Sequence, residues 1–389
     1  MKLGVSSERP WRRTLRLLHL WVGVTLCIPL VAIGLTGSVL VFEHELEALF
    51  ESPSPLRAGP GPARTVAEIV DASRAAAPDG LVASAYVAPE HAGEAASVRF
   101  AAPGRQGPGG GRVVLVDPAT LATHLVPAGA PRLLRQIFLL HANLLVSGRD
   151  GREIVGWFGV AMLVLGFSGL VLWWPRGGRW KAALTVKRGA HGYRLQRDLH
   201  GVVGIWSLVV FIVVSASGVY LAFPQTTGEI LRAALPARDL RATAQAIRVE
   251  PVRGSAPMPL DDAVALAESA VPGTAVRMLA LPGRPDQPLR VSLVRGAAEH
   301  GAPGITVWID PGTRRVIEIR DPRDYTAGET VLAWQHALHA GSGLGWGWKI
   351  AVFLSGLLPA LFAVTGIWMW LLKRRARRNA GVLAGQGAA

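Results

Sequence analysis

The sequence DLHGVVGIWSLVVFIVVSASGVYLAFP, from Asp198 to Pro224, joins a histidine to a stretch that is long enough to cross a membrane. The part from Val202 to Pro224 contains no charged side chain. At a rise of about 1.5 Å per residue, a helix of this length covers a hydrocarbon core of about 30 Å. The pattern therefore predicts a transmembrane helix with the imidazole of His200 at one end.

The same pattern occurs near the N-terminus as LHLWVGVTLCIPLVAIGLTGSVLVF, where His19 takes the place of His200. In both copies a glycine follows the histidine at the same spacing, Gly37 after His19 and Gly218 after His200. This spacing corresponds to about five whole helical turns, so each histidine and its glycine are expected on one stripe of a helix. Such a stripe could accommodate a flat group, although small residues also allow close helix packing.

Composition indicates a membrane protein with several domains. Half of the 389 residues are hydrophobic, and the mean hydropathy is +0.32. Four runs without charge are long enough to span a bilayer, and we interpret the first as a retained span because no signal-peptide cleavage pattern follows it. These runs are Leu20–Phe42, Ile154–Trp174, Val202–Pro224 and Ile350–Leu372.

The net charge of +14 is concentrated beside these spans. Residues 1–18, 175–198 and 373–389 together hold 17 basic and 2 acidic residues. Short basic segments next to spans stay on the cytoplasmic side. We therefore expect a multi-pass protein of the bacterial inner membrane with both termini in the cytoplasm, and residues 43–153 and 225–349 outside it. A basic surface for nucleic acid explains this distribution less well, so we expect no nucleic-acid partner.

Cysteine usage limits the metal chemistry. Cys27 is the single cysteine and lies inside the first expected span. The chain therefore has no intrachain disulfide, no C-x-x-C-H motif for covalent haem, and no thiolate cluster for zinc or iron–sulfur. Any redox metal would have to be bound by histidine.

The two segments expected outside the cytoplasm resemble each other. Thr65–Pro78 and Leu260–Pro272 are amphipathic helical patterns that end in proline, and alternating strands follow each of them. Both segments finish with a hairpin whose turn begins at an aspartate, Asp117 or Asp310. The predicted fold is a membrane protein with four transmembrane α-helices and two extracytoplasmic α+β modules, arranged as two half-repeats.

This organisation predicts eight segments along the chain. In order they are the cytoplasmic N-terminus with the first span (1–44), the first module (45–140), the second span with an outer histidine (141–174), a cytoplasmic loop (175–198), the third span (199–224), the second module (225–335), an outer histidine segment with the fourth span (336–372), and a basic cytoplasmic tail (373–389).

Short motifs in this order resemble the PepSY-associated transmembrane (PepSY_TM) family, which includes reductases of ferric siderophores that face the periplasm. The resemblance covers most of the chain and implies PepSY-like outer modules. In characterised ferric-siderophore reductases of this kind, b-type haem lies between the helices, and some hold two. The motifs are L-H at His19 with T-G at Gly37, R-D-L-H at His200 with S-G at Gly218, L-H-A at His141 and His339, and T-G-I-W at Gly366.

Four histidines match pairwise between the half-repeats. His19 and His200 are expected at the cytoplasmic ends of their spans, whereas His141 and His339 precede spans at the outer face. A b-type haem needs two axial nitrogens without covalent attachment, which two histidines supply. The resemblance thus implies two haem b groups, one at an inner pair and one at an outer pair. A lone histidine at a membrane interface, by contrast, is more often a capping or belt residue.

Three further residues are secondary candidates. His44 lies too far from His19 to share its cofactor and is an alternative outer ligand, as is His336, one turn before His339. Arg197 could pair with a haem propionate, because its planar guanidinium suits a carboxylate. Interface anchoring explains this arginine equally well.

The function that the resemblance implies is a haem-dependent transmembrane ferric reductase that delivers electrons to Fe(III), as a siderophore or another chelate. The sequence has no G-x-G-x-x-G motif, so the electron donor is expected to be membrane quinol or a cytoplasmic reductase. The alternative is a non-enzymatic PepSY membrane protein that binds or regulates a periplasmic partner. The identity of the chelate does not follow from the sequence.

Overall fold

The computed structural model describes residues 9–50, 56–91, 93–103, 111–126, 132–250, 258–296 and 301–386, so the expected terminal segments 1–44 and 373–389 are described in part. The chain divides into two units, which we describe separately. The helical unit comprises Met1–Glu43, Leu133–Ile230 and Gln335–Ala389. The sheet unit comprises His44–Arg132 and Leu231–Trp334.

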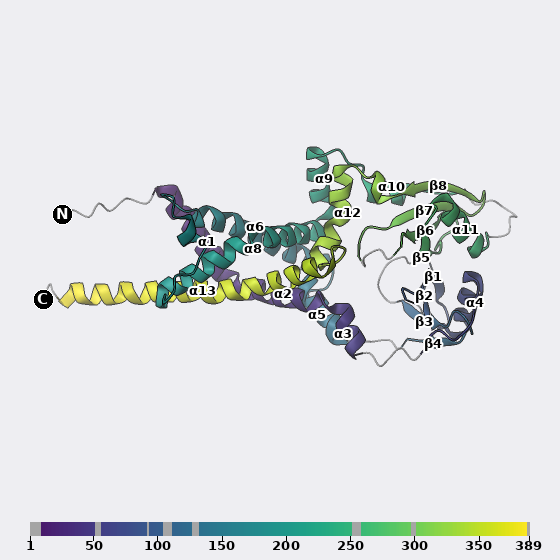
Figure 1. Cartoon of the computed structure of the whole chain (residues 1–389), viewed down its shortest axis with the longest axis horizontal. Coiled ribbons are helices and arrows are strands. Elements are labelled where there is room, and N and C mark those ends of the chain that lie inside the picture. Colours follow the sequence, from purple (N-terminus) through teal and green to yellow (C-terminus); the bar gives the residue numbers. More distant parts are fainter. Residues whose placement is uncertain are drawn as a thin grey trace. The chain divides into compact units, whose positions relative to one another are not determined.

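Long helices that lie alongside one another make up most of the helical unit (Figure 1). The unit boundaries fall inside α3, which is given below with the sheet unit, and inside α5, α9 and α12. The helices of this unit and of its boundaries are α1 (Pro10–Thr25), α2 (Cys27–Leu40), α5 (Arg132–Asn143), α6 (Arg149–Trp173), α7 (Trp180–Ala183), α8 (Gly192–Ala222), α9 (Pro224–Ala234), α12 (Ala327–Ala340) and α13 (Gly345–Gln386).

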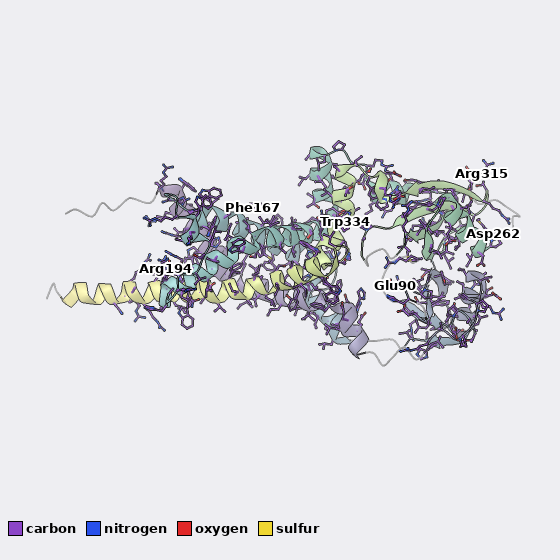
Figure 2. All side chains as sticks on the ribbon, in the orientation of Figure 1. Glu90, Phe167, Arg194, Asp262, Arg315 and Trp334 are labelled. Carbon is purple, nitrogen blue, oxygen red and sulfur yellow. The ribbon has the colours of Figure 1, made fainter. Side chains whose placement is uncertain are left out.

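Three of these helices, α6, α8 and α13, are long and apolar enough to cross a membrane, with mean hydropathies of 2.2 to 2.4 in their central windows. The pair α1 and α2 adds a fourth candidate if the two count as one span. Between 17% and 28% of each central window is buried inside the protein. Most of these apolar side chains, such as Phe167 on α6, therefore face outward, as lipid-exposed helices require (Figure 2).

The first expected span, Leu20–Phe42, is not one continuous helix in the structure. The chain bends by 66° between α1 and α2, at Leu26. Pro29 accounts for the break, because its ring would clash with the carbonyl of Thr25 and it has no N–H to bond there. The equivalent position of the second half-repeat, Val210, permits the unbroken helix α8.

Close backbone contact joins α2 to α13. The Ser38 hydroxyl donates to the Phe353 carbonyl at 2.8 Å, and a Cβ atom on Gly356 would lie 2.6 Å from the Gly34 carbonyl oxygen. A glycine is required here because any side chain would overlap the facing helix. Small residues at such crossings let membrane helices gain van der Waals contact.

The sheet unit is built on one antiparallel sheet with the strand order β4-β3-β2-β1-β5-β6-β7-β8. The expected hairpins and amphipathic helices are present in both half-repeats. The elements are α3 (Glu43–Phe50), α4 (Val66–Ala76), β1 (Val82–Val87), β2 (Ala96–Ala101), β3 (Arg112–Val116), β4 (Thr123–Leu125), α10 (Leu240–Ala246), α11 (Leu260–Ala270), β5 (Ala275–Ala280), β6 (Leu289–Val294), β7 (Ile305–Asp310), β8 (Arg315–Arg320) and the 3-10 helix η1 (Pro322–Asp324).

Helices α4 and α11 cover the same face of this sheet (Figure 1). Their inward side chains include Ile69 and Ala263, which meet alternate strand residues such as Val98 and Val291. All four are 1% exposed or less. Alternation along each strand thus places one set of side chains in a shared core and the other set on the opposite face.

The two half-repeats were expected to form two modules, and the structure joins their strands in one sheet through β1 and β5. Tyr86 pairs with Leu279 at this join, and both side chains are buried in the shared core. The Asp261 carboxylate adds a second link, because it accepts hydrogen bonds from the Val66 and Ala67 amides at 2.7 and 3.1 Å. These are amides of the first turn of α4, which have no partner within the helix.

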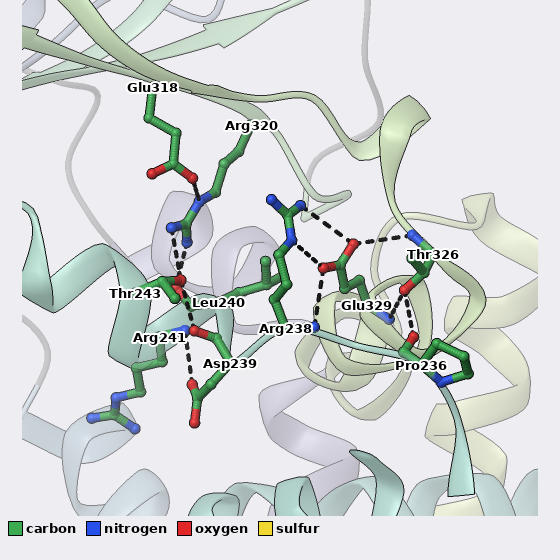
Figure 3. Close-up of polar contacts among 10 residues, drawn as sticks. All are labelled: Pro236, Arg238, Asp239, Leu240, Arg241, Thr243, Glu318, Arg320, Thr326 and Glu329. Carbon is green, nitrogen blue, oxygen red and sulfur yellow. Dashed lines mark hydrogen bonds and ion pairs between the residues drawn. The ribbon is translucent and has the colours of Figure 1, made fainter. Parts of the chain in front are cut away.

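A buried carboxylate fixes the start of α12 in the sheet unit (Figure 3). Glu329, which is 1% exposed, accepts hydrogen bonds from Arg238 Nε at 2.6 Å and from the Thr326 amide at 3.0 Å. The Thr326 hydroxyl donates in turn to the Pro236 carbonyl at 2.6 Å. The segment before α10 is therefore held against α12 by charge-assisted bonds.

Arg320 anchors α10 on the sheet (Figure 3). It lies on the face opposite α4 and α11, because its strand partner Thr306 stands between the core residues Ile305 and Val307. Its guanidinium donates to the Leu240 carbonyl, to the Thr243 hydroxyl at 2.9 Å and to Glu318 at 2.6 Å. It also lies over the Trp308 ring, 4.7 Å from the ring centroid. Helix α10 consequently covers the sheet face near β7 and β8 on the side away from α4 and α11.

A substitution at Gly356 tests the packing of α2 against α13. We expect Gly356→Ala to destabilise the protein by about 1–3 kcal/mol, the usual cost of inserting a methyl group where there is no room. The control is Gly347→Ala on the same helix, because no atom lies within 4 Å of the position of its Cβ. Thermal unfolding of the purified variants should show a lowered midpoint for Gly356→Ala alone; equal midpoints would contradict this packing.

The Glu329 cluster predicts a pH-dependent stability. The hydrogen bond from Arg238 is the main cause that lowers the pKa of Glu329 from 4.5 to about 2. The stabilisation is therefore complete above pH 4.5 and is lost as the pH falls towards 2. We expect Glu329→Gln to cost about 2–3 kcal/mol at pH 7 and to flatten the pH dependence between pH 5 and 2. If the unfolding midpoints of the wild type and of Glu329→Gln changed with pH in parallel, this prediction would be refuted.

Candidate functional site

Two histidines from different helices meet in the helical unit and form what we call the first pair. His19 on α1 and His200 on α8 have ring centroids 6.2 Å apart, with an angle of 73° between the ring planes. They are distant in the sequence and occupy the same position in the two half-repeats. The fold thus brings together the two residues that the spacing singled out.

Hydroxyl groups on two other helices hold the rings of the first pair. His19 Nδ1 lies 2.8 Å from Ser168 Oγ on α6, and His200 Nδ1 lies 2.8 Å from Thr365 Oγ1 on α13. Each hydroxyl also donates its proton to a carbonyl one turn earlier in its own helix. The hydroxyl oxygen must then accept from the imidazole, so Nδ1 carries the proton and Nε2 keeps a free lone pair.

A second pair repeats this arrangement with residues from α5 and α12. His141 and His339 have ring centroids 6.0 Å apart. His141 Nδ1 lies 2.9 Å from the Ile33 carbonyl, and His339 Nδ1 lies 2.9 Å from the Val214 carbonyl. A carbonyl can only accept, so here too the proton is on Nδ1 and the Nε2 lone pair is available.

A glycine lies against each of the four rings. Cβ atoms on Gly37 and Gly218 would lie 2.8 and 2.9 Å from Cε1 of His141 and His339, respectively, so a side chain at either position would displace the ring. His200 and Gly218 share one stripe of the unbroken helix α8, as expected, whereas the bend at Leu26 separates Gly37 from the helix of His19. Gly37 and Gly218 give clearance to the histidine rings of the second pair.

The glycines beside the first pair are Gly169 and Gly366. Their Cβ positions lie 3.4 Å from His19 Cε1 and 3.8 Å from His200 Cε1. Each glycine directly follows the hydroxyl residue that bonds the same histidine. A dipeptide of serine or threonine with glycine thus supplies both the hydrogen bond and the space for the ring.

The two pairs lie at different levels of the helical unit. His200 of the first pair belongs to α8, and the carbonyl that holds His339 belongs to Val214 of the same helix. These two positions are separated by about four turns, or about 21 Å along the helix axis. The same sequence spacing separates His19 from Ile33, although the bend at Leu26 intervenes.

The secondary candidates lie elsewhere. His44 is exposed and lies 3.9 Å from Glu47, and His336 is exposed on α12 one turn before His339. Arg197 donates to the buried carboxylate of Asp198 at 2.9 Å, and Arg194 donates to the same group at 2.7 Å. The structure thus gives Arg197 an acidic partner within its own helix.

Each pair offers two nitrogen ligands. In the part of the chain that the structure describes, no three histidine, cysteine, aspartate or glutamate side chains come together as a metal site. Zinc sites normally use three or four protein ligands. Two imidazoles that each keep a free Nε2 would suit a metal whose remaining positions a planar chelator fills.

Sequence reasoning found the histidines but missed the partners that orient them. Ser168 and Thr365 bond the first pair, and Thr36 and Ser217 lie 3.4 and 3.3 Å from Nδ1 of the second pair. The available signal was a serine or threonine directly before glycine, which occurs in each of the four apolar runs; the fourth run has a second such pair, Ser355-Gly356, which lies against α2 and not against a histidine. The motifs are Thr36-Gly37, Ser168-Gly169, Ser217-Gly218 and Thr365-Gly366.

Comparison with known proteins identifies a family. Residues 16–373 match the family described as the PepSY-associated TM region, which covers all four histidines and their partners. No curated protein matches the sequence.

The hydrogen bond to His19 can be tested by its removal. Ser168→Ala leaves the Nδ1–H of His19 without an acceptor, and a buried donor without a partner costs about 1–3 kcal/mol. Ser207→Ala is the matched control, because Ser207 on α8 bonds carbonyls of its own helix. Thermal unfolding should show a lower midpoint for Ser168→Ala than for Ser207→Ala. If the control loses as much, the bond to His19 does not stabilise the protein.

Proposed function

The chain belongs to the family of the PepSY-associated TM region, and we propose that it is a haem b-containing reductase of the bacterial inner membrane. In this proposal the protein passes electrons across the membrane to Fe(III) in the periplasm, held as a ferric siderophore or another chelate. The two histidine pairs would hold one haem b each.

One observation carries the proposal. Four half-buried histidines are each held through Nδ1, and their rings meet as two pairs with centroids 6.2 and 6.0 Å apart. Histidine ligands of metals usually donate their second ring N–H to an oxygen, which fixes the tautomer and the orientation of the ring. The hydroxyl and carbonyl partners of both pairs provide this arrangement in advance.

Haem, when bound, supplies reversible one-electron transfer, which the side chains of this protein do not supply themselves. The chain contributes the ligands, their orientation and their spacing. His19 and His200 would ligate one group, and His141 and His339 the other. Apolar residues near the first pair, such as Phe362 at 4.9 Å from the His200 ring, limit the access of water.

The direction of electron flow rests on the charge distribution. Residues 175–198 and 373–389 hold 12 of the basic residues and include the start of α8 and the end of α13, so the positive-inside rule favours a cytoplasmic position for these helix ends. The first pair is near this end of α8. The second pair lies at the level of Val214, about 21 Å further along the axis of α8. Membrane quinol or a cytoplasmic reductase would then donate to the first pair, and the second pair would serve the periplasmic acceptor.

Reduction has a chemical purpose in this setting. Siderophores bind Fe(III) through hard oxygen ligands, and the softer Fe(II) is held more weakly by such donors. A protein that delivers one electron to the chelate would therefore release the iron. The competing proposal is a membrane protein that binds or regulates a periplasmic partner without a cofactor, and it predicts a colourless protein.

The haem content of single variants tests the proposal. We expect the purified protein to contain two haem b groups per chain by the pyridine haemochrome assay, and His200→Ala and His339→Ala to contain one each. His336→Ala should retain both, because this exposed histidine lies one turn from His339 outside the pair. A wild-type protein without haem absorbance, from haem-sufficient cells, would refute the proposal. Loss of haem in His336→Ala would refute the assignment of the second pair.

A further inference from the structure

Two arginines lie in one row across the centre of the sheet. Arg99 on β2 pairs with Ala85 on β1, Ala85 pairs with Ala280 on β5, and Ala280 pairs with Arg290 on β6. Side chains of directly paired residues point to the same face of an antiparallel sheet. The row therefore presents one guanidinium group at each end and two methyl groups between them.

This row lies on the face opposite α4 and α11. The adjacent row contains Val98, Tyr86, Leu279 and Val291, and all four are buried in the core beneath these helices. Because successive side chains of a strand alternate between faces, the arginine row must face the other way. Arg99 and Arg290 are both exposed.

The neighbouring positions on this face are small or weakly polar. Ser97, Val87, Met278 and Ser292 form the next row, in register from β2 to β6. They add two hydroxyl groups and apolar surface beside the alanines. With strands about 4.8 Å apart, the Cα atoms of the two arginines are separated by about 14 Å, and a floor of small side chains lies between them.

The charge of these two arginines is not neutralised within the described part of the chain, where neither guanidinium makes a hydrogen bond or an ion pair. Several other arginines of the sheet unit have acidic partners. Arg277 lies 3.0 Å from Glu90, and Arg295 lies 2.6 Å from Asp321. Two exposed guanidinium groups on one face of the sheet that have no acidic partner among the described residues are suited to an anion.

We propose that this face binds a small Fe(III) chelate with several negative charges. This inference rests on the proposed function and gives the charge class of its substrate. Arg99 and Arg290 would each donate paired hydrogen bonds to carboxylate or catecholate oxygens, which the planar guanidinium matches. Only the methyl groups of Ala85 and Ala280 stand between the two arginines in this row. Chelates without negative charge would gain little from this surface.

Binding of a redox-inert analogue tests the proposal without electron transfer. The probe is a Ga(III) tricatecholate complex with three negative charges, titrated calorimetrically into the full-length protein in lipid nanodiscs. We expect Arg99→Ala and Arg290→Ala each to weaken binding about tenfold, since each removes a charge-assisted contact. The uncharged Ga(III) trihydroxamate complex should bind at least tenfold more weakly than the tricatecholate.

Arg315→Ala is the matched control. Arg315 is an exposed arginine on the edge strand β8, at a distance from Glu90 and the β1–β5 join, and it also makes no side-chain bond within the described residues (Figure 2). Its variant should bind the tricatecholate as the wild type does. The proposal is overturned if the wild type does not bind the probe, if the double variant of Arg99 and Arg290 binds it unchanged, or if Arg315→Ala weakens it equally.

The result is separable from the haem proposal. Gallium is not reduced, so binding does not require a working electron path, and the haem content of each sample is measured beside it. Weak binding in a variant with normal haem content locates the defect in the sheet unit. A protein that lacks haem but binds the tricatecholate through both arginines would refute the reductase while the anion site stands.

Discussion

The structure depends on the hydrogen bond from Nδ1 of four histidines to an oxygen on a different helix. Each bond fixes a tautomer and a ring orientation at once, and it leaves Nε2 with a lone pair. Each bond also links two helices that are distant in sequence, such as α1 to α6 through His19 and Ser168. Ring orientation and helix packing are therefore two consequences of the same contacts, and the haem groups that we propose would meet nitrogen atoms that are already oriented.

The duplicated half-repeat explains why two pairs exist. Each pair takes one histidine from each half, so neither half is sufficient alone. The sheet unit repeats the same logic, because β1 and β5 join two similar sets of strands and Asp261 of one half caps α4 of the other. The halves are not identical. Pro29 breaks the first span, whereas α8 is unbroken. In the sheet, the row that contains Arg99 and Arg290 is charged, whereas the neighbouring row has Ser97 and Ser292 on the same two strands.

Much of this could be predicted from the sequence, for physical reasons. Uncharged runs of sufficient length predict spanning helices, and the equal spacing of His19 and His200 from their glycines revealed the repeat. The role of those glycines could not be predicted, because Gly37 contacts a ring from α5 and spacing within one helix carries no information about another helix. The union of the strands in one sheet was missed for the same reason, since alternation predicts strands but not their partners.

Electron transfer across a membrane tests the central claim most directly. The purified protein is reconstituted into vesicles that enclose a membrane-impermeant reductant, and reduction of an external Fe(III) chelate is followed by the colour of an Fe(II) indicator. The account predicts reduction by vesicles with the wild-type protein, and loss of that reduction when one histidine of either pair is replaced by alanine. Reduction at the rate of protein-free vesicles, or wild-type rates in variants of both pairs, would contradict it.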